Sequence, residues 1–192
     1  MNLKIGIILA SVREQRVGET VANWVLDEVN LVKEDNVSFE IIDLRNYKMP
    51  FVGITPTDEE AKTIDSWKSK MSEMDGYVLV TPEYNRMVPG ALANAFQYLF
   101  PEVSDKALAF VGYGFLGAAR AINNFRSALS ILKLALVQKQ INISFNTDFK
   151  NANTKDMEFT PGAWHKADLK IFTEQLTNWS KALKALREGK LN

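Results

Sequence analysis

Five apolar runs alternate with amphipathic stretches along this chain, and this alternation constrains its fold more than any other feature. The runs occupy residues 4–9, 37–44, 77–80, 106–112 and 139–145, the first of them continuous and β-branched as in a strand covered on both faces. Helical patterns occupy residues 18–30, 58–74, 90–98, 118–136 and 164–188, with Asp58 expected to cap the second helix. Such alternation predicts an α/β fold, a parallel sheet with helices on both faces.

The composition is that of a globular chain without bulk charge. At 192 residues the chain has the length of one typical domain, so we expect a single domain over 1–192. Lysine plus arginine and aspartate plus glutamate both number 23, so the formal net charge is zero. This balance argues against nucleic acid or a membrane surface as a partner and leaves small molecules as the expected substrates.

The chain contains no cysteine and one histidine, His165. These counts exclude disulfides, thiolate catalysis and cysteine-based or multi-histidine metal sites, so no metal centre is expected. Redox chemistry in such a chain requires a bound organic cofactor. The apolar run before Arg13 is too short for a signal-peptide core or a membrane span, which favours a cytoplasmic location. We expect His165 to be a surface or helix-cap residue.

The loop at residues 10–18 leads from the first strand into the first helix. A helix start presents unpaired N–H groups that suit a phosphate, and Ser11, Arg13 and Arg16 add a hydroxyl and two guanidinium groups. The dinucleotide fingerprint GxGxxG and the nucleotide motif GxxxxGK(S/T) are both absent. The loop therefore indicates a phosphate-holding site, and the alternative is a solvated polar turn with exposed arginines.

The loop at residues 81–90 follows the third strand and combines two prolines and a glycine with Glu83, Tyr84 and Asn85. A rigid backbone here can offer N–H and C=O groups to the edge of a flat heterocycle, and Tyr84 offers an apolar surface. The same residue types also favour ordinary turns. The loop is therefore either part of a binding site or a structural turn.

Three glycines lie within residues 112–117, where the fourth strand joins the next helix. Glycine allows the backbone to approach a ligand closely, and Tyr113 and Phe115 are placed to cover a ring. The alternative is a tight turn with core aromatic residues. Because ligands of parallel sheets bind at the carboxyl ends of the strands, three such loops at one edge favour a binding site.

The three loops contain motifs that occur in the same order in a known family. They read Ala10-Ser11-Val12-Arg13, then Pro82-Glu83-Tyr84-Asn85 with Pro89-Gly90 and Leu92-Ala93-Asn94-Ala95, then Gly112-Tyr113-Gly114 with Gly117-Ala118-Ala119-Arg120. Over residues 3–145 the chain thereby resembles the NADPH-dependent FMN reductases, flavodoxin-like proteins that include quinone, azo-dye and chromate reductases. The resemblance implies a flavodoxin-like three-layer sandwich whose five-stranded parallel sheet has the order 2-1-3-4-5. Residues 146–162 match nothing in this family pattern.

The resemblance also implies FMN as the cofactor. Its phosphate would lie against the first loop, at Ser11, Arg13, Arg16 and the backbone of Val17 and Gly18. Its ring would be held by Pro82, Glu83, Tyr84 and Asn85 and, near the pyrimidine end, by Tyr113 and Gly114. We expect Arg86 and Phe115 to contact substrate, with Arg86 attracting the NADPH 2′-phosphate or an anionic acceptor, unless Arg86 is simply a solvent-facing cation. Three positions depart from the family pattern, namely Ala10, Arg86 and Gly112.

The implied activity is that of an NAD(P)H-dependent FMN reductase or quinone reductase. A hydride would pass from NADPH or NADH through flavin N5 to a quinone, free flavin, azo compound or similar acceptor by a ping-pong mechanism, with no catalytic side chain. N–H groups of the turn at 113–114 would stabilise charge at flavin N1 and O2. The alternatives are a flavodoxin-like electron carrier without its own substrate and a regulatory protein that lacks flavin. The apolar faces of the helices at 92–99 and after Gly117 predict a homodimer or homotetramer.

Overall fold

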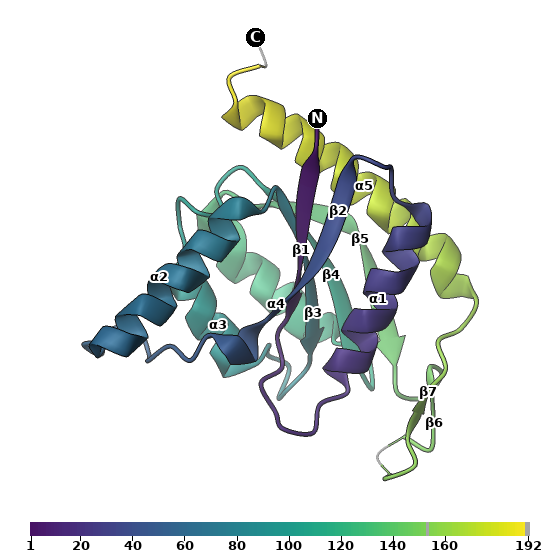
Figure 1. Cartoon of the computed structure of the whole chain (residues 1–192). Coiled ribbons are helices and arrows are strands. Elements are labelled where there is room, and N and C mark those ends of the chain that lie inside the picture. The colour runs from purple at the N-terminus through teal and green to yellow at the C-terminus, as the bar shows by residue number, and fades with distance from the viewer. Residues whose placement is uncertain (153, 191–192) are drawn as a thin grey trace.

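A five-stranded parallel sheet forms the centre of the protein, as the computed structural model shows for residues 1–152 and 154–190. The strands lie in the order β2-β1-β3-β4-β5, which confirms the predicted order (Figure 1). Their bounds are β1 Leu3–Leu9, β2 Val37–Asp43, β3 Gly76–Pro82, β4 Ala107–Gly114 and β5 Ala135–Ser144. All pairings within this sheet are parallel, so the carboxyl ends of the strands meet at one edge.

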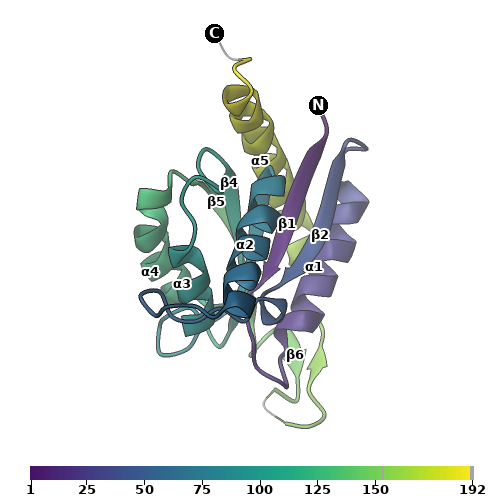
Figure 2. The same cartoon turned by 60° about the vertical axis from the view of Figure 1, so that its left-hand side comes forward.

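Helices cover both faces of the sheet, and Figure 2 shows the three layers from the side. Helices α1 (Gly18–Val32) and α5 (Trp164–Arg187) pack on one face; α2 (Asp58–Glu73), α3 (Gly90–Gln97) and α4 (Ala119–Leu129) pack on the other. Every residue of β3 and β4 is buried because apolar helix faces lie above and below these two strands. No helix among the described residues is long and apolar enough to cross a membrane.

Two local predictions about helix ends were wrong. Helix α2 is capped by Thr57, whose hydroxyl accepts from the Glu60 N–H while the Glu60 carboxylate accepts from the Thr57 N–H, so Asp58 is already helical. The helix predicted over 118–136 ends at Leu129, followed by a 3₁₀ turn at Ser130–Leu132. Lys133 then adopts a φ of 53° and stops the helix, because left-handed backbone cannot continue a right-handed helix.

The segment after β5 forms a small antiparallel hairpin of β6 (Phe149–Lys150) and β7 (Glu158–Phe159), which was not predicted. It projects from the carboxyl edge of the sheet near the start of α1 (Figure 1). Its base is held by the buried Asp148 carboxylate, which accepts from the Ser144 and Gly162 N–H groups at 2.8 and 3.0 Å.

His165 completes this base, with its Nε2 lying 3.0 Å from Asp148 Oδ1. The expectation that His165 is a surface or cap residue was wrong, because it is only 4% exposed. We call Asp148 and His165 the hairpin anchor. Although burial alone would raise the pKa of Asp148, hydrogen bonds from Gly162 and Ser144 and the nearby His165 lower it.

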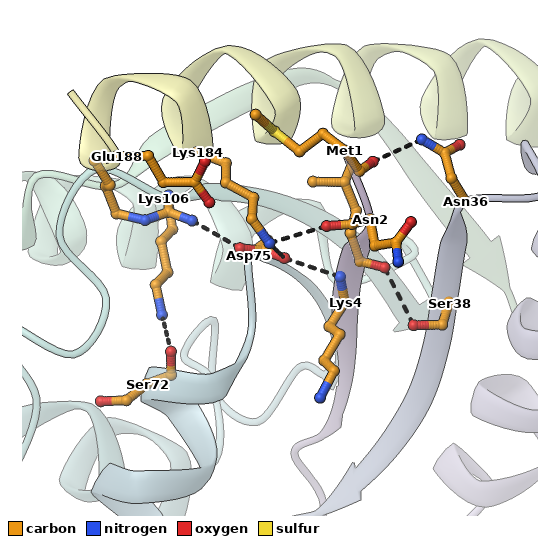
Figure 3. A network of polar contacts seen from close by, with 12 residues as sticks. Met1, Asn2, Lys4, Asn36, Ser38, Ser72, Asp75, Lys106, Lys184 and Glu188 are labelled. Atoms are coloured by element: carbon orange, nitrogen blue, oxygen red, sulfur yellow. Dashed lines mark hydrogen bonds and ion pairs between the residues drawn. The ribbon is translucent and has the colours of Figure 1, made fainter. Parts of the chain in front are cut away.

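A polar network fastens the opposite, amino-terminal edge of the sheet (Figure 3). Asp75, just before β3, accepts from the Lys4 N–H at 3.0 Å, from Lys184 Nζ at 2.8 Å and from Arg187 Nη2 at 2.9 Å. Buried Lys106 donates to the last carbonyls of α2, and burial lowers its pKa to about 8. These contacts tie α5 and α2 to the amino ends of the strands, so the loops at the other edge are the ones open to a ligand.

Candidate functional site

A cleft of about 430 Å³ opens at the carboxyl ends of β1, β3, β4 and β5. Its walls include all of the predicted site residues except Gly18, namely Ser11, Arg13, Arg16, Val17, Pro82, Glu83, Tyr84, Asn85, Arg86, Tyr113, Gly114 and Phe115. The fold therefore brings the three predicted loops to one place. Because strand order reverses beside β1, this edge is also the usual ligand position in a doubly wound sheet.

The sequence interpretation missed four residues of this cleft: Gln15, Leu116, Arg120 and Phe145. Phe145 directly follows β5, so the strand-end rule that found the other loops points to it as well. Arg120 belongs to one of the recognised motifs, but its role depends on a partner from another loop. Gln15 and Leu116 carry no signal of their own in the sequence.

The first loop offers unpaired donors. Within the described part of the chain, none of the backbone N–H groups of residues 11–17 donates a hydrogen bond. Arg16 donates to the Ser11 carbonyl at 2.8 Å and to the Asp43 carboxylate at 2.7 and 2.5 Å. Its Nε–H is buried and has no partner. An unpartnered guanidinium N–H beside free amides at a helix start fits an anion such as a phosphate.

The Arg16–Asp43 ion pair fixes the shape of this loop. Hydrogen bonding to Asp43 raises the pKa of Arg16. Burial alone would raise the pKa of Asp43, but hydrogen bonds from Arg16 and from the Arg45 N–H lower it. Two of the three guanidinium nitrogens of Arg16 are therefore used inside the protein, and only Nε remains for a ligand. Arg13 differs, since it has no ion-pair partner among the described residues.

Gly18 does not line the cleft and serves packing instead. A Cβ atom at this position would lie 2.4 Å from Tyr113 Oη and 3.0 Å from Leu9 Cδ1. Only glycine lets the start of α1 approach the buried Tyr113 side chain this closely. Burial raises the pKa of Tyr113, so its hydroxyl stays protonated at neutral pH.

The second loop is a two-residue reverse turn. Tyr84 and Met87 exchange both backbone hydrogen bonds at 2.9 Å, while Asn85 and Arg86 have φ values of 51° and 63°. Asparagine tolerates this left-handed backbone, whereas for arginine it costs about 1–2 kcal/mol. The turn places Tyr84 Oη 3.4 Å from Ser11 Oγ and beneath the Arg13 guanidinium, 5.9 Å from the ring centroid.

The Glu83 carboxylate is occupied within the protein. It accepts from Arg120 Nε at 2.7 Å and from the Ala121 N–H at 3.3 Å, at the start of α4. The second loop is thereby fastened to α4, and a bound ring would meet the backbone of Glu83 instead of its side chain. The Asn124 amide donates to the Arg86 carbonyl at 2.9 Å and adds a second fastening.

The third loop is a close-packed turn that needs its glycines. A Cβ at Gly112 would lie 2.1 Å from the Gly117 carbonyl oxygen, and Gly117 itself has a φ of 57°. Phe115 is 56% exposed and packs edge-on against Phe145 at 5.6 Å between centroids. Tyr113 is buried, so Phe115 is the aromatic residue of this loop that is free to meet a ligand.

The combined site suits a flat molecule with an anionic tail. Arg13 and Arg86 have no ion-pair partners among the described residues, while Glu83 is neutralised by Arg120. Tyr84 and Phe115 offer apolar ring surfaces near the unpaired amides of the first loop. The sheet order, the unpaired donors of the first loop and the aromatic strand-end loops together define a flavodoxin-like protein.

Comparisons with known proteins place the chain within this class. Residues 3–148 match the family model described as NADPH-dependent FMN reductase. An NAD(P)H-dependent FMN reductase of Schizosaccharomyces pombe is 34% identical over 140 residues, which cover 68% of each chain. A quinone reductase of Escherichia coli strain K12 is 27% identical over 144 residues, covering 71% of this chain and 74% of the relative.

The solved structure of FerB, a flavoenzyme NAD(P)H:(acceptor) oxidoreductase from Paracoccus denitrificans, has the same fold. It superposes with a TM-score of 0.67 at 18% identity and covers 94% of this chain and 98% of its own. The chain belongs to the NADPH-dependent FMN reductase family. It is therefore an oxidoreductase that depends on FMN and NAD(P)H.

Proposed function

We propose that this protein holds FMN in the cleft and transfers reducing equivalents from NAD(P)H to a quinone, free flavin, azo compound or similar organic acceptor. The observation that carries the proposal is the buried, unpartnered Nε–H of Arg16 next to the free amides of residues 11–17. These groups match a phosphate, and the aromatic walls beside them match a flat ring. In this proposal the whole chain, residues 1–192, is one FMN-binding domain located in the cytoplasm.

The first loop would bind the phosphate. Ser11 contributes a hydroxyl, Arg13 a free guanidinium and Arg16 its remaining Nε–H, together with the backbone of Val17 just before α1. Because the Asp43 carboxylate holds Arg16 in place, the loop is preorganised and loses little conformational freedom on binding.

The second and third loops would hold the ring. The reverse turn fixes the backbone of Pro82, Glu83 and Asn85 and places Tyr84 as a wall, while the backbone of Tyr113 and Gly114 would face the pyrimidine end. FMN held by these residues would supply the redox chemistry, namely hydride transfer between NAD(P)H and the acceptor. The chain contributes orientation, hydrogen-bond donors and exclusion of water, and no side chain has to act as acid or base.

Binding of FMN tests the central claim. Purified protein should show a flavin absorbance spectrum after addition of FMN, and calorimetry should show one site per chain. Arg13→Glu should weaken FMN binding about tenfold or more, since it replaces a charge-assisted contact with repulsion. Lys62→Glu, the same charge reversal at an exposed position on α2, is the matched control and should bind FMN normally. Equal binding by wild type and Arg13→Glu contradicts the phosphate assignment.

Both substrates would use the same open side of the cleft in turn, which predicts ping-pong kinetics. Double-reciprocal plots at several acceptor concentrations should be parallel. Intersecting lines would show that donor and acceptor bind together. Oxidation of NADPH by the isolated protein with a quinone present separates this enzyme activity from a flavodoxin-like electron carrier, which would need a protein partner.

We also propose that the protein forms a homodimer through the groove between α3 and α4. This groove has a volume of about 450 Å³ and is lined mainly by apolar residues such as Phe96, Phe125 and Leu132. Exposed Met87 and Ile131 stand at its rim. Size-exclusion chromatography with light scattering should give twice the monomer mass of 21.7 kDa, and Ile131→Glu should shift the protein toward monomer.

A further inference from the structure

We propose that the β6–β7 hairpin forms a second subsite, which takes the adenosine phosphate half of the dinucleotide donor. The inference rests on the proposed function, because it assigns a place to part of the NAD(P)H molecule. It concerns residues that lie beyond the family match, which ends at residue 148. The hairpin is therefore a feature of this chain that the family pattern does not describe.

A second cavity of about 580 Å³ lies between the hairpin and the first loop. It adjoins the cleft at the first loop, since both cavities are lined by Arg13, Gln15, Arg16, Val17 and Phe145. A molecule longer than a single flat ring can therefore reach from one cavity into the other. A dinucleotide has this form, with its nicotinamide half in the cleft and its adenosine half at the hairpin.

The hairpin side of this subsite is aromatic. Phe149 packs against Phe145 at 5.1 Å and against Phe159 at 4.9 Å between ring centroids, and Phe159 packs on Trp24 at 5.6 Å. Because Phe145 also contacts Phe115, the aromatic surface continues from the cleft to the hairpin. Purine rings stack on aromatic side chains of this kind.

The opposite side of the subsite is polar and positively charged. Gln15 and Thr20 supply an amide and a hydroxyl from the first loop and the first turn of α1. The Arg13 guanidinium, which would also contact the FMN phosphate, has five N–H donors and is shared between the two sites. None of the described residues that line this cavity carries a carboxylate. An apolar, aromatic wall facing hydrogen-bond donors and a cation suits a ligand that joins an aromatic base to a phosphate.

The subsite is held in position before any ligand binds. The hairpin anchor fixes the start of β6 and the end of β7, because Asp148 receives hydrogen bonds from both sides of the hairpin and its carbonyl accepts from the Thr160 N–H at 2.8 Å. A fixed wall reduces the entropy lost on binding, so the hairpin can contribute to affinity for the donor.

The test uses adenosine 2′,5′-bisphosphate, which carries the adenosine phosphate half and cannot donate a hydride. Calorimetry on the FMN-loaded protein should show binding that competes with NADPH. Met157 lines the cavity from the hairpin, so Met157→Glu should weaken this binding about five- to tenfold and Met157→Lys should strengthen it. Phe159→Leu keeps an apolar side chain without a ring face and should also weaken binding.

The same variants should change the KM for NADPH in parallel, while FMN affinity and kcat at saturating donor stay at wild-type values. Leu31→Glu, a charge added at a 77% exposed position on α1, is the control and should leave all these values unchanged. The subsite is overturned if adenosine bisphosphate does not bind, or if both Met157 variants bind it like wild type. Failure to take up FMN overturns the proposed function instead. In that case the bisphosphate titration, repeated on the FMN-free protein and its Met157 variants, still decides the subsite, because it needs no redox chemistry.

Discussion

Replacing Gly18 by alanine sets two effects of opposite sign against each other. Helix propensity alone predicts stabilisation, since alanine is favoured over glycine by up to about 1 kcal/mol within a helix. The structure predicts the reverse, because the new Cβ would lie 2.4 Å from Tyr113 Oη and 3.0 Å from Leu9 Cδ1. Non-bonded carbon and oxygen atoms keep about 3.3 Å or more between them, so the buried tyrosine ring has to move by about an ångström.

Overpacking of this kind costs about 1–3 kcal/mol. After subtracting the small gain in helix propensity at a first-turn position, we expect Gly18→Ala to lower the free energy of unfolding by about 1–2 kcal/mol. For a chain of this size the midpoint of thermal unfolding should fall by about 2–4 °C per kcal/mol. Urea unfolding followed by circular dichroism measures the free energy, and FMN affinity should fall with it because Tyr113 lines the cleft.

Tyr113→Phe supplies the internal control. It removes the atom that a Cβ at position 18 would meet first, so the double variant should recover at least about 1 kcal/mol relative to additive single effects. Recovery should be incomplete, since the Leu9 contact remains. If Gly18→Ala is as stable as wild type, or if the two substitutions are additive, the close approach of α1 to Tyr113 does not explain this glycine.

Three further predictions concern other parts of the chain. Arg86→Gly should raise the free energy of unfolding by about 0.5–1 kcal/mol, because glycine accepts the left-handed backbone at this turn, and thermal unfolding checks this. Burial lowers the pKa of Lys106 to about 8 in the folded protein. Between pH 8 and 10.5 the Lys106 side chain therefore binds more protons in the unfolded chain than in the folded one. The free energy of unfolding of wild type should rise with pH across this window relative to that of Lys106→Met. Hydrogen bonds lower the pKa of Asp148 in the folded protein, so its contribution to the free energy of unfolding is present above pH 4 and lost as the pH falls further. Urea unfolding at pH 7 should show Asp148→Asn less stable than wild type by about 1–3 kcal/mol, and this difference should shrink at pH 3.

Patterns that repeat along the chain were sufficient to predict the sheet and the position of the site. Apolar runs mark the strands because a strand covered on both faces must be apolar throughout, and loops that follow parallel strands must meet at one edge. The stretch around Lys133 misled the prediction, since apolar residues at 132, 134 and 136 fit the end of a helix and the start of a strand equally well. Only the left-handed backbone at Lys133 shows that the helical turns end there and that the strand begins after it.

The residues of the cleft were predictable by type, whereas their partners were not. Arg16 and Glu83 both looked like ligand contacts, yet both terminal nitrogens of Arg16 donate to Asp43 and Glu83 is neutralised by Arg120, and these partners lie 27 and 37 residues away in the sequence. The sequence predicted a surface or helix-cap position for His165, because it does not show that the fold places the Asp148 carboxylate within hydrogen-bond distance of the imidazole.

By itself, then, the sequence determined the succession of strands and helices along the chain, the edge at which the cleft opens and the chemical groups available there, because these follow from short-range patterns and from the rules of parallel sheets. Tertiary structure alone decided which of those groups stay free, and it added the hairpin wall beside the first loop. The physical reason is that a charged side chain forms its ion pairs and hydrogen bonds with groups that folding brings close to it, and here those groups lie far away in the sequence.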